Sequence, residues 1–162
     1  MIEVVLTPEE STYACSIGEL RHQEAIRQGR PDQHGAVGSS YDAGLKMHQD
    51  GAAGELAAAK ALGRPWAATV NTYKRGGDLG ENVQVRLRRK LYYDLIVRKG
   101  DRPDDYYILV LRELPATKFW VVGWIQGKDA QRDEWWNNYG GYGGAWFVPQ
   151  NCLTRFPDDN SV

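Results

Sequence analysis

The chain has 162 residues, of which 42% are hydrophobic, and a formal net charge of -1. A chain of this length buries one core and is short for two, so we expect a single domain over residues 1–162. The near-neutral charge excludes a generally basic coat for nucleic acid, so affinity for phosphate must come from local clusters of Lys and Arg.

The N-terminal part, residues 7–63, is expected to be helical. Glu10 lies three residues after Thr7, and this capping box predicts a first helix that runs to about residue 28. The Gly-, Ser-, Asp- and His-rich residues 30–44 then predict an irregular loop.

A second, alanine-rich helix is expected over residues 48–62, with Asp50 as its N-terminal cap. Glu55 shares a face of this helix with Ala58 and Ala59, so its carboxylate projects from the stripe that should pack inward. Burying an ionised carboxylate without a partner costs much free energy. Glu55 therefore either lies at the lip of the helix and reaches water, or faces a positive group.

The rest of the chain is typical of strands and turns. Short runs of β-branched and aromatic residues, bounded by Gly, Pro or Asp, predict strands at 67–73, 82–89, 94–99, 106–112 and 119–126. Short connections favour an α+β fold whose mainly antiparallel or mixed central sheet has about five strands and is flanked by helices. Residues 127–162 predict a short helix near Trp135, a glycine- and aromatic-rich piece, and an extended segment at 146–148.

Polar residues alternate along the predicted strand 82–89. One face carries Asn82, Gln84, Arg86 and Arg88, and the other carries Val83, Val85 and Leu87. The bend at Gly76 and Gly77 should bring Asp78 near the beginning of the polar face. Together with an inward-pointing Glu55, this places two carboxylates, an amide and a guanidinium at one end of the sheet.

Such a set of side chains suits phosphoryl chemistry. Carboxylate and amide oxygens are ligands for a hard divalent cation, so Glu55, Asp78 and Gln84 are the candidate ligands of Mg²⁺ or Mn²⁺. A metal there lowers the pKa of a bound water and screens charge on a phosphoryl group, and Arg86 stabilises the same charge. These four residues are the predicted catalytic set.

The stretches GELAAAKALG, GGDLGENV and Gln84-Val85-Arg86 resemble the motifs of the PD-(D/E)XK nuclease superfamily. In that superfamily a helix supplies a glutamate, a turn supplies an aspartate, and the next strand supplies an acid, a spacer and a lysine. The chain is also similar, over residues 50 to 153, to short proteins of phage and bacterial genomes. The resemblance implies a PD-(D/E)XK-like core and metal-dependent hydrolysis of DNA in the cytoplasm of a bacterial or phage-infected cell.

The sequence departs from the superfamily pattern at two positions. Gln84 replaces the acid, which removes a negative charge and should weaken metal binding, and Arg86 replaces the lysine, so the geometry of a lysine-activated water is not reproduced. A slow or inactive nuclease is therefore an open alternative. Asp94, at the start of YDLIV, competes with Asp78 for the place of the superfamily aspartate and is a reserve ligand.

Basic residues cluster around the predicted site. The expected nucleic-acid contacts are Lys74, Arg75, Arg88, Arg89 and Lys90, and Arg98 and Lys99 follow further along. The alternative is a charged strand edge that guards against aggregation. Two other functions stay open: an inactive nuclease-fold module that binds nucleic acid or protein, and a phage structural or interaction protein whose polar cluster is a buried hydrogen-bond network.

Nothing in the sequence indicates export, a membrane or a nucleotide cofactor. Cys15 and Cys152 lack metal or redox spacing, so we expect reduced, buried cysteines in a cytoplasmic protein. No run approaches the roughly 20 apolar residues that span a bilayer, and the segment GGYGG lacks the strand and helix context of a dinucleotide loop. DNA is the expected partner.

Overall fold

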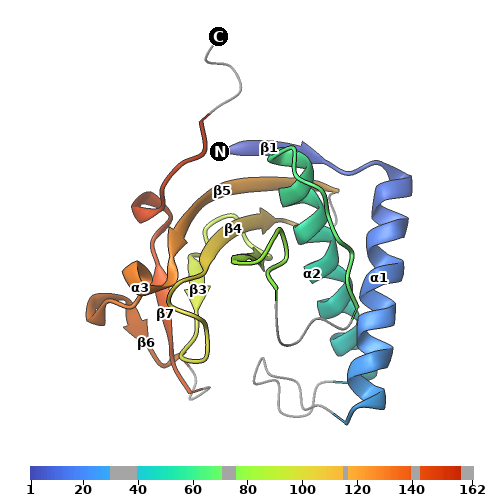
Figure 1. The fold of residues 1–162 in the computed structure, drawn as a ribbon, viewed down its shortest axis with the longest axis horizontal. Coiled ribbons are helices and arrows are strands. Elements are labelled where there is room, and N and C mark those ends of the chain that lie inside the picture. The colour runs from blue at the N-terminus through green and yellow to red at the C-terminus, as the bar shows by residue number, and fades with distance from the viewer. Residues whose placement is uncertain (30–39, 71–75, 115–116, 140–142, 158–162) are drawn as a thin grey trace.

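The computed structural model describes residues 1–29, 40–70, 76–114, 117–139 and 143–157. A mixed four-stranded sheet lies between two long helices on one side and a smaller, three-stranded sheet on the other (Figure 1). The long helices are α1 (Pro8–Arg27) and α2 (Tyr41–Ala61), and α3 (Gly127–Ala130) is short. The predicted α+β class is therefore confirmed.

The main sheet has the strand order β1-β5-β4-β2. Its strands are β1 (Ile2–Val5), β2 (Val83–Arg88), β4 (Tyr106–Arg112) and β5 (Lys118–Gln126). Strand β5 pairs antiparallel with β1 and β4, whereas β2 runs parallel to β4. The sheet is thus mixed, with four strands instead of about five, and it includes an N-terminal strand that the sequence pattern did not predict.

The parallel pair arises because the chain leaves the main sheet between β2 and β4. It forms β3 (Leu95–Val97), which starts the second sheet. That sheet has the order β3-β7-β6, with β6 (Trp136–Asn137) and β7 (Ala145–Val148). The predicted strands 94–99 and 146–148 therefore both form, but they pair with each other. The predicted strand 67–73 is wrong over residues 67–70, and its remainder lies outside the described residues.

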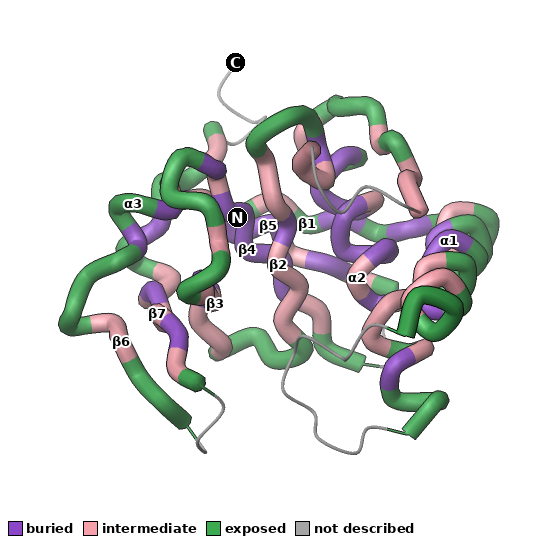
Figure 2. Tube along the Cα trace, turned by 60° about the horizontal axis from the view of Figure 1, so that its bottom comes forward, coloured by how far each residue is buried: buried purple, intermediate pink, exposed green. Residues whose placement is uncertain are grey.

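Strand β4 is the centre of the core because both of its faces are covered. Ile108 and Val110 pack against the helices, while Leu109 and Leu111 pack against the second sheet. Figure 2 shows the buried positions running through the middle of the molecule along this strand. The sequence of a strand that is buried on both faces is a continuous run of apolar residues, and β4 has such a sequence, YYILVL.

The helix starts follow their caps. The Thr7 side chain accepts the Glu10 N–H at 3.1 Å, and Glu10 accepts the Thr7 N–H at 2.8 Å, so the predicted capping box is confirmed. Helix α2 begins earlier than predicted because the Ser40 hydroxyl accepts the Ala43 N–H at 3.3 Å. The prediction that Asp50 caps this helix is wrong, since Asp50 lies inside it.

The cysteines are free, as predicted, but their predicted burial is wrong, because both thiols are exposed. Cys15 lies on the outer face of α1 next to the buried Ala14, and Cys152 ends a surface 3₁₀ turn, Gln150–Cys152. The brief helix predicted to carry Trp135 and Trp136 is wrong in part: Asp133–Trp135 form a 3₁₀ turn, and Trp136 begins β6. Within the described part of the chain, the helices are too short or too polar to cross a membrane.

Candidate functional site

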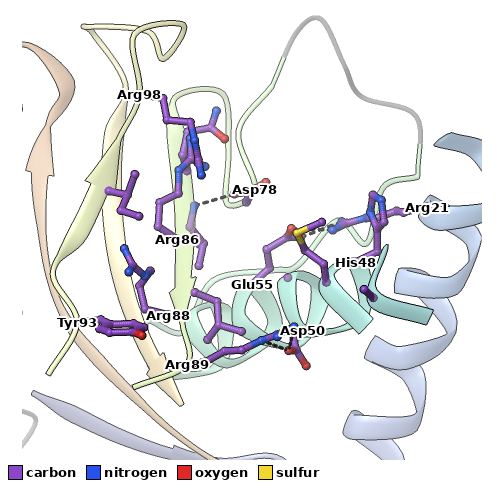
Figure 3. Close-up of a pocket in the computed structure, with 17 residues that line it drawn as sticks. Arg21, His48, Asp50, Glu55, Asp78, Arg86, Arg88, Arg89, Tyr93 and Arg98 are labelled. Carbon is purple, nitrogen blue, oxygen red and sulfur yellow. Dashed lines mark hydrogen bonds and ion pairs between the residues drawn. The ribbon is translucent and has the colours of Figure 1, made fainter. Parts of the chain in front are cut away.

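A cavity of about 660 Å³ lies along β2, the edge strand of the main sheet, and is lined by residues of α2 and of both faces of β2 (Figure 3). The predicted site residues that line it are Glu55, Asp78, Gln84, Arg86, Arg88 and Arg89. The fold therefore brings the whole predicted catalytic set to one cavity. Lys90 and Asp94 do not line it, and the predicted contacts Lys74 and Arg75 lie outside the described residues.

Two glycines let the elements around the cavity approach closely. A Cβ on Gly54 would lie 3.0 Å from the Cβ of Leu87, so the absence of a side chain lets α2 pack directly on β2. A Cβ on Gly18 would overlap the backbone of Gln49, so α1 and α2 also meet closely. As a result, Glu55, which follows Gly54 in α2, lies between β2 and α1.

Glu55 is buried, and its charge is met by Arg21 of α1. Arg21 donates Nη1–H to Oε1 at 2.6 Å and Nη2–H to Oε2 at 2.8 Å, and Trp66 Nε1 donates to Oε2 at 3.0 Å. Of the two readings that the sequence left open, the positive partner is the observed one. The sequence pattern did not identify Arg21, since it lies 34 residues from Glu55 and carries no local motif.

Asp78 is placed by the glycine turn that the sequence suggested. The Gly77 N–H donates to the Gly80 carbonyl at 2.6 Å, and a Cβ on Gly77 would overlap the Val83 carbonyl, so the turn requires glycine at this position. The Val85 N–H donates to Asp78 Oδ2 at 2.6 Å. Oδ2 of the carboxylate is therefore bound to the backbone of β2, and Asp78 lines the cavity.

The pKa of Asp78 is raised to about 7. Burial is the main cause, and the negative charge of Glu55 adds to it. The Val85 N–H and the charges of Arg86 and Arg21 act in the opposite direction. Asp78 and Glu55 are thus close enough to repel each other, which is the situation that a bound cation relieves.

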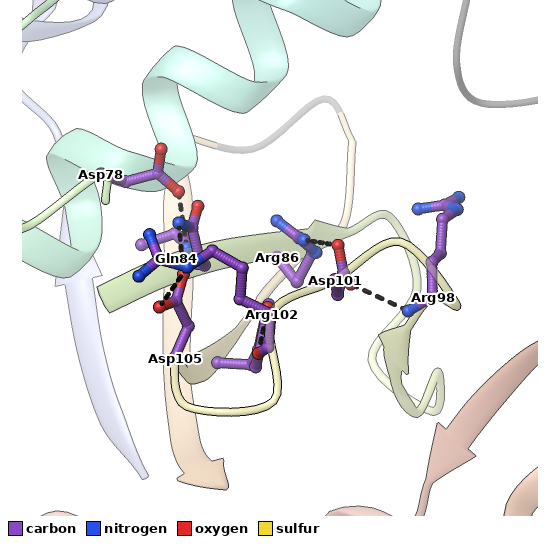
Figure 4. A network of polar contacts seen from close by, with 9 residues as sticks. Asp78, Gln84, Arg86, Arg98, Asp101, Arg102 and Asp105 are labelled. Atoms are coloured by element: carbon purple, nitrogen blue, oxygen red, sulfur yellow. Dashed lines mark hydrogen bonds and ion pairs between the residues drawn. The ribbon is translucent and has the colours of Figure 1, made fainter. Parts of the chain in front are cut away.

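Gln84 is oriented by a buried acid that the sequence pattern did not single out. Its Nε2 donates to Oδ2 of Asp105 at 3.0 Å, and Asp105 is only 1% exposed (Figure 4). Because a carboxylate only accepts hydrogen bonds, the amide nitrogen of Gln84 must face Asp105. The amide oxygen, Oε1, then points away from Asp105, and Gln84 lines the cavity. Asp105 belongs to a segment that the sequence indicated only as a turn.

Arg86 is held by an ion pair and a ring. Its Nη2 donates to Oδ1 of Asp101 at 2.9 Å, and its guanidinium carbon lies 5.1 Å from the centre of the Tyr107 ring. Within the described residues, its buried Nε has no hydrogen-bond partner. Asp101 also accepts the Arg98 N–H through Oδ2 at 2.8 Å, so it joins β2 to the turn that follows β3.

Arg89, a predicted nucleic-acid contact, has its guanidinium committed to another residue. Arg89 Nε donates to Oδ2 of Asp50 at 2.8 Å, and Arg112 Nη1 donates to Oδ1 at 3.2 Å. Asp50 is 7% exposed and joins α2 to the ends of β2 and β4. This trio of residues holds the fold together at the edge of the cavity.

Arg88 and Arg98 lie on the same side of the cavity as Arg86. Arg88 Nη1 donates to the main-chain oxygen of Asp94 at 3.2 Å, and its guanidinium lies 4.5 Å from the centre of the Tyr93 ring. Burial lowers the pKa of both arginines; the charge of Arg98 further lowers that of Arg88, and the charge of Arg86 further lowers that of Arg98. Asp94, the reserve ligand, contributes only its backbone here.

The donors in the cavity fit a hard cation that keeps several of its waters. Glu55 and Asp78 supply two carboxylates and Gln84 supplies an amide oxygen, which matches the few protein ligands that Mg²⁺ usually takes. Over the residues that the structure describes, no group of three or more His, Cys, Asp or Glu is placed to hold a metal ion. The predicted ligand set offers two acids and one neutral amide.

Fold and site define an α+β protein with a cavity that has acids on its helix side and arginines on its strand side. Comparison of the chain with known protein families, with curated proteins and with solved structures finds no match. The chemistry of the cavity itself is therefore the basis for a function.

Proposed function

We propose that the protein is a metal-dependent nuclease of the PD-(D/E)XK type, which hydrolyses phosphodiester bonds of DNA. The observation that carries this proposal is that Glu55, Asp78, Gln84 and Arg86 line a single cavity although they come from three different segments of the chain. Such a nuclease acts in the cytoplasm of a bacterial or phage-infected cell, where its substrate lies.

Each residue of the set has a role that its geometry supports. Oε1 of Glu55, Oδ1 of Asp78 and Oε1 of Gln84 are the atoms proposed to hold Mg²⁺ or Mn²⁺. When bound, the cation would supply a water of lowered pKa and screen negative charge on the phosphoryl group. The Val85 N–H donates to Oδ2 of Asp78, and Nε2 of Gln84 donates to the carboxylate of Asp105. Both proposed ligands are therefore oriented before a metal binds.

Arg86 is proposed to donate to the phosphoryl oxygens as negative charge develops on them. It stays protonated and cannot act as a general base, so it differs in role from a lysine that handles a proton. Its buried Nε–H lacks a partner among the described residues, which leaves it a donor for a phosphate. Asp101 and Tyr107 fix the direction of the side chain.

An inactive module that binds nucleic acid is the second candidate, and one observation favours it. Arg21 already neutralises Glu55 with two hydrogen bonds, so the negative charge that attracts a divalent cation is reduced. The neutral Gln84 reduces it further. Both features point to weak metal binding, and a nuclease built this way is expected to be slow.

Incubation of the purified protein with linear, plasmid and branched DNA in Mg²⁺ or Mn²⁺ tests the proposal. We expect cleavage by the wild type, loss of cleavage in Asp78→Asn, and full activity in Asp94→Asn, a control acid that does not line the cavity. Cleavage that survives the double variant Glu55→Gln with Asp78→Asn would overturn this site. Retention of DNA without cleavage under any of these conditions would favour the binding module.

A further inference from the structure

The strand side of the cavity gathers guanidinium groups with few negative partners. Figure 3 shows Arg86, Arg88 and Arg98 on the side opposite the Arg21–Glu55 pair. Arg86 and Arg88 are on the same face of β2, separated by one residue, and Arg98 follows directly after β3. The three charges come together because the chain leaves the main sheet after β2 and forms β3 beside that strand.

These arginines differ from the other cavity arginines in what they bind. Arg21 and Arg89 are each paired with a buried acid. Arg88 is bonded only to a backbone carbonyl and stacked on Tyr93, and the Arg98 guanidinium has no hydrogen bond or ion pair within the described part of the chain. Each of these two arginines therefore keeps several N–H donors free.

Gathering such groups on one cavity costs free energy, because Arg88 and Arg98 are both partly desolvated and each is near another positive charge, Arg88 near Arg98 and Arg98 near Arg86. An anion between them offsets both costs. Guanidinium presents paired donors that match the oxygens of a phosphate group, so phosphate is the anion that the geometry suits best.

We infer that Arg88 and Arg98 form a phosphate-binding subsite, which holds a nucleic-acid phosphate neighbouring the one proposed for Arg86. The class of ligand rests on the proposed function, whereas the subsite itself rests on the arginines. This inference gives the basic residues around the cavity two different roles: Arg88 and Arg98 bind substrate, while Arg89 stabilises the fold.

Binding of a labelled DNA oligonucleotide, followed by fluorescence anisotropy in EDTA over a series of salt concentrations, tests the subsite without cleavage. The variants are Arg88→Gln, Arg98→Gln and both together. Arg132→Gln is the control outside the cavity. Arg132 also donates to a backbone carbonyl, that of Asp129 at 3.2 Å, and lies 4.6 Å from the centre of the Trp135 ring; it differs in an exposed ion pair with Glu134 at 3.8 Å.

Each single variant is expected to weaken binding at least about fivefold. Each is also expected to flatten the slope of log affinity against log salt by about 0.7 to 0.9, the change for one lost phosphate contact. Arg132→Gln should leave both quantities unchanged. Thermal unfolding of each variant verifies its fold, and Arg88→Lys and Arg98→Lys, which keep the charge, should bind with intermediate affinity.

The arms of the experiment separate two sources of phosphate. A loss of affinity that appears only with 5′- or 3′-phosphorylated oligonucleotides assigns the subsite to a terminal phosphate, and an equal loss with unphosphorylated ones assigns it to the backbone. Unchanged affinity and slope in the folded double variant, or a wild type that binds no oligonucleotide, would overturn the inference. Binding through Arg88 and Arg98 without any cleavage would leave the subsite standing and reject only the nuclease.

Discussion

Arg21 binds both carboxylate oxygens of Glu55, at 2.6 and 2.8 Å, from a different helix. The pair lets an ionised acid remain inside the protein, where an unpaired charge would be very costly. It also means that Arg21 and any divalent cation compete for the same carboxylate. Stability and the proposed metal binding are therefore expected to be coupled at Glu55.

Replacement of Arg21 by Gln is expected to destabilise the fold by about 3 kcal/mol. The variant leaves Glu55 buried without its cation, and breaking one side of a buried pair has this order of cost. The side chains are 16% and 10% exposed, so solvent screens the pair only in part. Urea unfolding at neutral pH measures the difference.

Arg132→Gln is the control, because its ion pair with Glu134 lies on the surface, where the two side chains are 57% and 66% exposed. It should leave the unfolding midpoint unchanged. The double variant Arg21→Gln with Glu55→Gln should recover part of the lost stability, since no uncompensated charge remains. If the losses in the free energy of unfolding caused by Arg21→Gln and by Glu55→Gln simply add up in the double variant, the two residues are not coupled.

Removal of Arg21 should also tighten Mg²⁺ or Mn²⁺ binding. The carboxylate of Glu55 then has no competing cation, and a bound metal restores stability to the folded state. Isothermal titration calorimetry of Arg21→Gln should therefore give a higher affinity than the wild type, while Asp94→Asn should match the wild type. An affinity that falls in Arg21→Gln would show that Arg21 supports the metal site and does not compete with it.

Stability should depend on pH through Asp78. Its pKa in the folded state is raised to about 7 from 3.8, so between these values the folded state binds more protons than the unfolded state. The resulting stabilisation is fully present below pH 3.8 and is lost as the pH rises through about 7. Relative to Asp78→Asn, the wild type should lose up to about 1.4 kcal/mol per pH unit in this window.

Urea unfolding of both proteins at several pH values between 4 and 8 tests this. Only the difference between the two proteins matters, because other carboxylates titrate equally in both. Asn keeps an oxygen that accepts the Val85 N–H, so the turn should persist in the variant. A difference that is flat with pH, or that grows in favour of the wild type as the pH rises, would contradict a raised pKa.

Local patterns predicted the parts of the site that depend on neighbours within a few residues. The alternation of β2 placed Gln84 and Arg86 on one face, and the glycine bend brought Asp78 to the start of that strand. Helical periodicity likewise directed Glu55 inward. Each of these predictions rests on the geometry of a single strand, turn or helix.

Residues that complete the site from a distance were not predictable in this way. Arg21 reaches Glu55 across 34 residues, and Asp105 reaches Gln84 across 21. Their positions depend on how α1 packs on α2 and on the parallel pairing of β2 with β4, which no local pattern specifies. The wrong assignment of Asp50 as a cap has a local origin, since α2 already starts at the Ser40 cap and Asp50 lies inside the helix, where it pairs with Arg89.

Asp105 is expected to act on the proposed metal site through Gln84. In Asp105→Asn the residue at this position can donate as well as accept, so the Gln84 amide is no longer fixed with Oε1 pointing away from residue 105. We expect Mg²⁺ affinity to fall by about tenfold, the usual range for a residue that orients a ligand. Calorimetry on Asp105→Asn should show this loss, and the same change in a Gln84→Met background, which has no amide to orient, should have no further effect. Equal losses in both backgrounds would mean that Asp105 acts on the cavity by a route other than Gln84.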